Sequence, residues 1–205
     1  MRKRNLYFVS FLLIFLFNCI ELQAKDEIPE GWNKWVNSQY SPSAYEAGID
    51  TKVFHSPPKS YYIKFNELTE IKTSSRPTAS IHQSLLIKDF LGKRIKLSAF
   101  LKGNNLTGKA AFYIHIHSVK DGREEYLRRG ADDIRGSTDW KLCTIIIDVE
   151  ENASSFIYGL FIEGQGQVWV DDVNIEIVGK EIPEKGVWFP EKGKPYNLCV
   201  IHACR

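Results

Sequence analysis

The chain has 205 residues, of which 43% are hydrophobic and 25% are charged, and its formal net charge is +2. This length favours one well-cored domain over two. Because charges of both signs are interspersed along the chain, the balance gives no indication of a nucleic acid partner.

The first residues have the three regions of a secretory signal. Arg2, Lys3 and Arg4 precede an apolar run over 6–17, and a polar segment ends at Ala24. The run is shorter than the roughly 20 apolar residues that a membrane helix needs. We therefore expect export to the periplasm or beyond, with an uncleaved membrane anchor as the alternative.

Two ways of processing this signal fit the sequence. Cleavage after Ala24 would remove a signal peptide over 1–24 and release a soluble protein. Leu16 to Cys19 resembles a bacterial lipoprotein box, whose use would remove residues 1–18 and leave Cys19 as a lipidated N-terminus. Phe17 and Asn18 stand where that box prefers small residues, so soluble secretion is slightly favoured.

Either outcome leaves Cys143, Cys199 and Cys204. The last two are close in sequence, and an oxidising compartment favours a local disulfide between them. Together with His202 they are also soft metal ligands, but a closed zinc site needs a fourth group. Cys143 falls within a strand pattern, where a buried thiol acts as a small hydrophobic side chain.

Residues 25–44 lack a regular period, which predicts an N-terminal lead-in lying on the domain. Over 45–179, polar and apolar residues alternate with a period near two, which is typical of β-strands. The expected strands are 45–54, 61–65, 79–87, 95–102, 109–119, 125–129, 140–148, 155–163 and 168–177. Asn104 and Asn105 are expected to turn the chain. About nine short strands at this spacing predict an all-β fold, a single jelly-roll β-sandwich, followed by a C-terminal tail over 180–205.

Five aromatic side chains divide into two groups. Trp140 and Trp169 share strand faces with aliphatic residues and are interpreted as core residues, because a tryptophan buries a large apolar area between sheets. The last strand is accordingly expected to bury its odd-numbered side. Trp32, Trp35 and Tyr40 precede the first expected strand, so they are the better candidates for stacking on a ligand.

Three segments carry a family resemblance, namely GKRIKLSAFLK over 92–102, GSTDWKLCTIIIDVEENA over 136–153 and GLFIEGQGQVWVDDVNIEIV over 159–178. They resemble the galactose-binding-like jelly roll that occurs beside AraC-type regulator domains and in exported bacterial proteins of unassigned function. More distantly, the Asp-Asp-Val entry into the last strand is similar to that of carbohydrate-binding modules. The likeness spans 31–178 and implies the fold, whereas one fold hosts many functions.

The resemblance also implies a metal site. In related carbohydrate-binding modules, an aspartate at the place of Asp171 often helps to hold a structural calcium ion. Calcium takes about six to eight oxygen ligands, which Glu46 or Asp50 on the first strand would help to supply. The alternative is that Asp171 and Asp172 mark a strand bend, where one carboxylate accepts backbone N–H groups.

Tyr113, His115 and His117 alternate along one strand and therefore share a face. With Arg128 they form a candidate ligand surface, in which Tyr113 would stack on a sugar and the imidazoles would hydrogen bond its hydroxyls. Two alternatives stay open. The histidines are two ligands of a transition metal, or the face is an ordinary half-exposed one, because alternation alone explains the spacing.

The sequence contains no GxSxG elbow, HExxH motif or P-loop, and no GxGxxG after a strand. Since these motifs carry much of nucleophilic, metal and nucleotide chemistry, we expect no enzyme. The prediction is a non-catalytic exported binding module for carbohydrate or another small polar ligand. The alternative is a structural or interaction protein of the bacterial cell envelope, with a membrane as partner only through a lipid anchor.

Overall fold

The computed structural model describes residues 28–71, 76–120 and 123–188, without the side chains of 120–129 and 188. The expected signal peptide, the lipidation site Cys19 and the disulfide pair Cys199 and Cys204 lie outside the described residues. Within those described ranges, no helix is long and apolar enough to cross a membrane.

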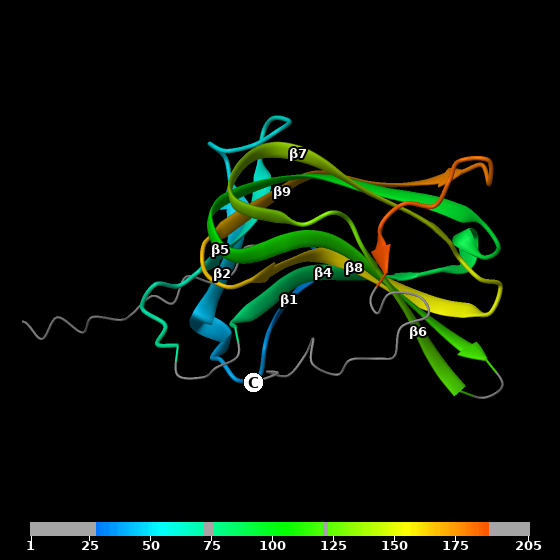
Figure 1. Ribbon diagram of the computed structural model, residues 1–205, viewed down its shortest axis with the longest axis horizontal. Helices are drawn as coiled ribbons and strands as arrows, with labels where there is room; N and C mark the ends of the chain where they lie inside the picture. The colour runs from blue at the N-terminus through cyan, green and yellow to red at the C-terminus, as the bar shows by residue number, and fades with distance from the viewer. Residues whose placement is uncertain (1–27, 72–75, 121–122, 189–205) are drawn as a thin grey trace, which may run out of the picture.

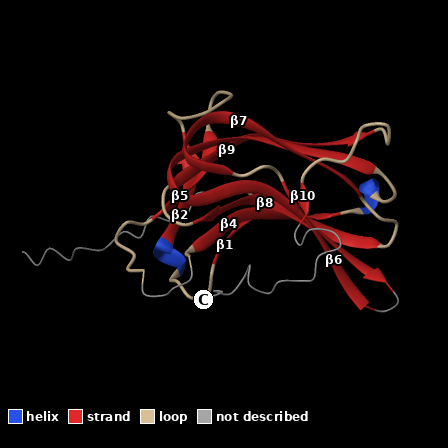
Figure 2. Cartoon of the chain, in the orientation of Figure 1, coloured by secondary structure: helices blue, strands red, loops and turns tan. Residues whose placement is uncertain are grey.

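Almost all of the regular secondary structure in the described chain is β-strand, which confirms the all-β fold class (Figure 2). The strands are β1 (Trp32–Val36), β2 (Tyr45–Asp50), β3 (Ser60–Phe65), β4 (Thr78–Leu86), β5 (Arg94–Lys120), β6 (Arg123–Gly130), β7 (Ile134–Asp148), β8 (Ala153–Glu163), β9 (Gln167–Val178) and β10 (Val187–Trp188). Two short 3-10 turns lie between strands: η1 (Pro42–Ala44) between β1 and β2, and η2 (Lys88–Phe90) between β4 and β5.

Strand β5 takes part in both layers of a sandwich. Its first part, 94–104, pairs with β7 and β9, and its second part, 109–118, pairs with β8 and β6. Beyond β9 the first layer continues through β3 and β2, and beyond β8 the second continues through β4 and β1. Figure 1 shows β7 and β9 lying above β8, β4 and β1. The predicted jelly-roll sandwich is confirmed.

The predicted chain turn at Asn104 and Asn105 is wrong. The backbone stays in one strand through these residues, and Asn105 adopts a left-handed conformation with φ of 52°. The pairing of β5 with β7 shifts register three times between Leu101 and Ala110. These irregularities bend the strand into the second layer without ending it, because an unpaired extra residue increases local twist.

The core lies between the two layers and is built from alternate residues of every long strand. From β5 it receives Ile95, Leu97 and Ala99 in the first layer, and Phe112 and Ile114 in the second, all with no exposed surface. Full burial of each large side chain stabilises the fold by roughly 1.5–3 kcal/mol. Cys143 joins this core as expected, and burial raises the pKa of its thiol to about 11.

Both flanking segments contribute to the sandwich. The lead-in supplies β1, which pairs with β4 from Trp32 to Val36 as an edge strand. In the tail, β10 pairs with β6. Arg94 binds both carboxylate oxygens of Asp148 at 2.8 Å and donates to the carbonyls of Lys180 and Ile182. The guanidinium thereby fixes the start of the tail to the start of β5.

Strand β9 changes its buried side part of the way along. Val168 and Val170 belong to the core, whereas beyond the bend Val173 and Ile175 pack against it. The pairing with β5 shifts register at this point, and Asp172 has φ of 50°. Before the bulge both faces are buried, because Trp169 is only 7% exposed, so the predicted odd-numbered buried side is incomplete there. After the bulge the prediction holds for Val173 and Ile175 but not for Ile177, which is 50% exposed. One extra residue exchanges the two faces of the strand.

A substitution at Gly108 tests whether the crossing of β5 between the layers requires a residue without a side chain. A Cβ atom there would lie 2.1 Å from the carbonyl oxygen of Glu163, which is backbone and cannot move aside alone. We expect Gly108→Ala to lower the free energy of unfolding by about 1–3 kcal/mol, measured by chemical denaturation. Leu86→Ala, at a side chain 88% exposed, is the control and should change it by less than about 0.5 kcal/mol. Equal stability of the two variants would contradict this account of the crossing.

Candidate functional site

The outer face of the second layer carries the residues of the predicted ligand surface. We call it the histidine face and define it by Trp35, Ser80, His82, Tyr113, His115, His117 and Phe161. These side chains share one side of the sheet because residues directly opposite one another in antiparallel strands project the same way. Tyr113 lies opposite Gly159, which lies opposite His82.

Tyr113 is the most deeply covered aromatic side chain of the histidine face. Its ring centroid lies 4.8 Å from that of His115 and 6.1 Å from that of Phe161. Only 9% of the residue is exposed, and this burial raises the pKa of the phenol, against the effect of a hydrogen bond with Ser80. Tyr113 therefore leaves little of its ring open for the expected stacking role, because its neighbours cover it.

His82 belongs to the face and was missed by the sequence analysis. Gly159 makes room for it, since a Cβ atom at Gly159 would lie 2.9 Å from the Cβ of His82. Its Nδ1 lies 3.3 Å from the Ser80 hydroxyl, and burial lowers the pKa of the imidazole. The lowered pKa favours the neutral ring, which has one donor and one acceptor nitrogen. The alternation of His82 with Ser80 and Ser84 was the available signal.

The other predicted binding residues, His115, His117 and Arg128, lie along one edge of the histidine face. His115 and His117 are both half-buried, and the Ser154 hydroxyl lies 3.2 Å from Nδ1 of His117. The backbone of Arg128 pairs opposite His115, and its side chain lies outside the described residues. The structure thus places the three predicted strand residues together and sets Arg128 beside them in register.

Trp35 is the exposed aromatic side chain of the histidine face. It lies opposite Ser80, which in turn lies opposite Phe161, and it is 51% exposed. Of the other two early candidates, Trp32 packs edge-on against Tyr158 at 5.5 Å and Tyr40 is only 9% exposed. A planar ring beside imidazole and hydroxyl groups suits a ligand with an apolar face and polar edges.

The proposed calcium ligands each bind a different protein group. Asp171 accepts hydrogen bonds from the backbone N–H groups of His55 and Ser56, at 2.8 and 3.0 Å. Asp50 accepts one from the indole of Trp169 at 2.9 Å, as well as two from the backbone of its own turn. Glu46 lies 4.0 Å from Lys64. Over the described ranges, no group of three or more His, Cys, Asp or Glu is placed to hold a metal ion.

Asp172 fixes the loop that joins β2 and β3. Its Oδ2 atom lies 2.7 Å from both the Ser56 hydroxyl and Nδ1 of His55. The His55 ring stacks on Phe100 at 3.6 Å and meets Trp140 edge-on at 5.9 Å.

The interpretation of Trp140 as a core residue is wrong, since it lies half-buried on the outer face of the first layer.

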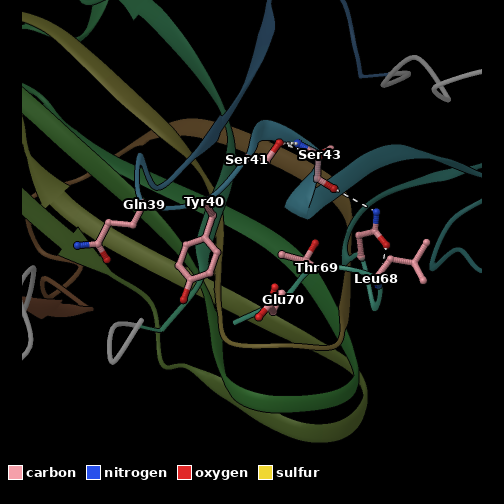
Figure 3. Close-up of a pocket in the computed structure, with 8 residues that line it drawn as sticks. Gln39, Tyr40, Ser41, Ser43, Leu68, Thr69 and Glu70 are labelled. Atoms are coloured by element: carbon pink, nitrogen blue, oxygen red, sulfur yellow. Dashed lines mark hydrogen bonds between the residues drawn. The ribbon is translucent and has the colours of Figure 1, made fainter. Parts of the chain in front are cut away.

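A separate pocket opens at one end of the sandwich, with a volume of about 480 Å³ (Figure 3). The segment between β1 and β2 supplies Gln39, Tyr40, Ser41 and Ser43, and the segment after β3 supplies Asn66, Leu68, Thr69 and Glu70. Neither segment held a residue that the sequence had singled out for binding, apart from Tyr40.

No family model matches the chain. An uncharacterised HTH-type transcriptional regulator of Bacillus subtilis (strain 168), YbfP, is 30% identical over 166 residues, which are 80% of this chain and 55% of the regulator. The chain thus spans about half the length of this curated relative.

Among solved structures, the chain is similar to a xylan-binding domain of carbohydrate-binding module family 22, with a TM-score of 0.50 and 12% identity over 75% of this chain and 90% of that domain. It is also similar to the module-bearing Clostridium thermocellum xylanase 10B (0.51 and 15%, over 76% of this chain and 27% of the xylanase). A tailspike protein of bacteriophage CBA120 scores 0.53 at 10% identity, over 73% of this chain and 20% of the tailspike. The chain therefore has the jelly-roll fold of carbohydrate-binding modules, as the resemblance implied.

The carboxylate of Asp172 gives the site a testable pH dependence. The hydrogen bond from Ser56, followed by the contact with His55, lowers the pKa of Asp172 below its usual value of 3.8. A lowered folded-state pKa contributes stability above the unfolded pKa, and this stability is lost as the pH falls through the folded value. Asp172→Asn should therefore melt below the wild type near neutral pH, and the difference should vanish between about pH 5 and pH 2.

Asparagine is chosen because it tolerates the left-handed backbone at this position, so that the variant removes the charge and keeps the backbone conformation. Asp89→Asn on η2 is the control, and thermal melts at each pH are the measurement. A difference between wild type and Asp172→Asn that stays constant down to about pH 2 would show that the charge does not stabilise the loop.

Proposed function

We propose that this chain is an exported, non-catalytic binding module for carbohydrate or another small polar ligand, and that the ligand lies on the histidine face. The observation that carries the proposal is the half-exposed ring of Trp35 beside the polar row of Ser80 and His82, on the fold of carbohydrate-binding modules.

The chemistry of the face suits a sugar. An aromatic ring packs against the apolar face of a pyranose, and fixed polar groups bind its hydroxyls. Ser80, which is only 6% exposed, positions His82 through their contact at 3.3 Å, and His115 is positioned by its packing on Tyr113. Groups that are held in place before binding lose little conformational entropy on binding, which favours affinity.

The bacterial relative bears on the part of the proposal that concerns a binding module in general. Its name describes a transcriptional regulator, and the segment that it shares with this chain covers 55% of its length. We propose that the shared segment is a binding module in this chain. The N-terminal basic and apolar regions support export of this chain.

Trp35→Ala tests the proposal. We expect the wild type to be retained by at least one oligosaccharide class, and the variant to bind about tenfold more weakly because the stacking surface is lost. The measurement is a glycan array followed by calorimetry with the retained glycan. Trp140→Ala, on the outer face of the opposite layer, is the matched control and should bind as the wild type does.

Thermal melts of both variants establish that each is folded. If no glycan is retained at high protein concentration, or if Trp35→Ala binds as well as the wild type, sugar binding on this face is excluded. In the first case the envelope interaction protein becomes the better hypothesis.

A further inference from the structure

The pocket between the β1–β2 segment and the segment after β3 has the size of a small-molecule site. Its volume of about 480 Å³ lies within the range of roughly 300–1,000 Å³ that ligand sites occupy. Trp35 and the other residues of the histidine face do not line it. A ligand there would be independent of the function proposed above.

The walls of the pocket are held in place by the chain itself. Asn66 connects them, because its backbone N–H donates to the carbonyl of Ala44 at 2.8 Å and its amide group donates to that of Ser43 at 3.3 Å. The same side chain accepts the N–H of Leu68 at 3.0 Å. Two segments far apart in sequence are thereby fixed against each other before any ligand arrives.

A second set of contacts fixes the β1–β2 segment. The ammonium group of Lys34 donates to the carbonyls of Pro42 and Tyr45, at 3.1 and 2.8 Å. The hydroxyls of Ser41 and Ser43 lie 2.7 Å apart, as the dashed lines of Figure 3 mark. A preformed wall of this kind lowers the entropic cost of binding.

The lining groups define the class of ligand. The pocket is lined by the hydroxyls of Ser41, Ser43 and Thr69 and by the amide of Gln39, which both donate and accept hydrogen bonds. Glu70 adds a carboxylate that accepts hydrogen bonds, and no lysine or arginine stands among the described lining residues. Such a lining favours neutral polyols, because it offers many donors and acceptors and no described cation that would pair with an anion.

We propose that this pocket binds a single neutral sugar ring or a polyol of similar size, with Glu70 accepting hydrogen bonds from its hydroxyls. The hydroxyls of Ser41 and Ser43 meet the polar edge of the ligand. The site takes one ring, whereas the open histidine face suits an extended chain.

Titration of the purified protein with methyl glycosides of glucose, galactose and xylose, followed by NMR of the backbone amides, tests this site. We expect shifts over 39–43 and 66–70 with at least one glycoside, and none with glucose 6-phosphate. Glu70→Gln should weaken binding about tenfold. Glu67→Gln, on the same segment but outside the pocket, is the matched control and should bind as the wild type does.

Two further variants separate the pocket from the histidine face. Thr69→Tyr fills the pocket and should abolish the shifts, while Trp35→Ala should leave them unchanged. The proposal is overturned if no glycoside shifts the pocket amides at tens of millimolar, a range where even weak sugar sites fill. It is also overturned if glucose 6-phosphate binds more tightly than the glycosides, or if the shifts survive Thr69→Tyr.

Discussion

The passage of β5 between the two layers is the constraint on which the rest of the sandwich depends. One continuous backbone sets the register of β7 and β9 in one layer and of β6 and β8 in the other. Leu101 and Phe112 reach the same core from opposite layers because the strand bends between them. At the bend the backbone of Gly108 lies so close to that of Glu163 that a side chain has no room. Any shift along β5 would therefore disturb both layers and the core at once.

A second irregularity, the bulge at Asp171 and Asp172, connects the sheet to a loop. The extra residue turns both carboxylates toward the β2–β3 loop, where they accept hydrogen bonds from the backbone and side chains of His55 and Ser56. Asp171, which the resemblance marked for calcium, thus anchors a loop in this chain together with Asp172. The alternative interpretation of the Asp-Asp pair, a strand bend with a carboxylate accepting N–H groups, describes this geometry.

The two candidate binding surfaces arise from different parts of the fold. The histidine face is the outer side of a regular sheet, so its members follow from strand alternation and register, and it offers Trp35, imidazoles and hydroxyls over an open surface. The pocket is made by two connecting segments that Asn66 holds together, and it offers hydroxyls, amides and Glu70 around a confined volume. Because the two sites share no residue, a negative result at one of them does not affect the ligand proposal for the other.

The sequence alone determined the fold class, most of the strands and the shared face of Tyr113, His115 and His117, because alternation along a strand is a local property. It also placed Cys143 in the core. Only the tertiary structure decided that Tyr113 is covered and Trp35 exposed, since exposure depends on which strands become neighbours and on the side chains those neighbours bring. The continuity of β5, the change of face along β9 and the pocket at Asn66 were decided there as well. Each depends on pairing between segments distant in sequence, and the alternation of residues along one strand carries no information about its partner.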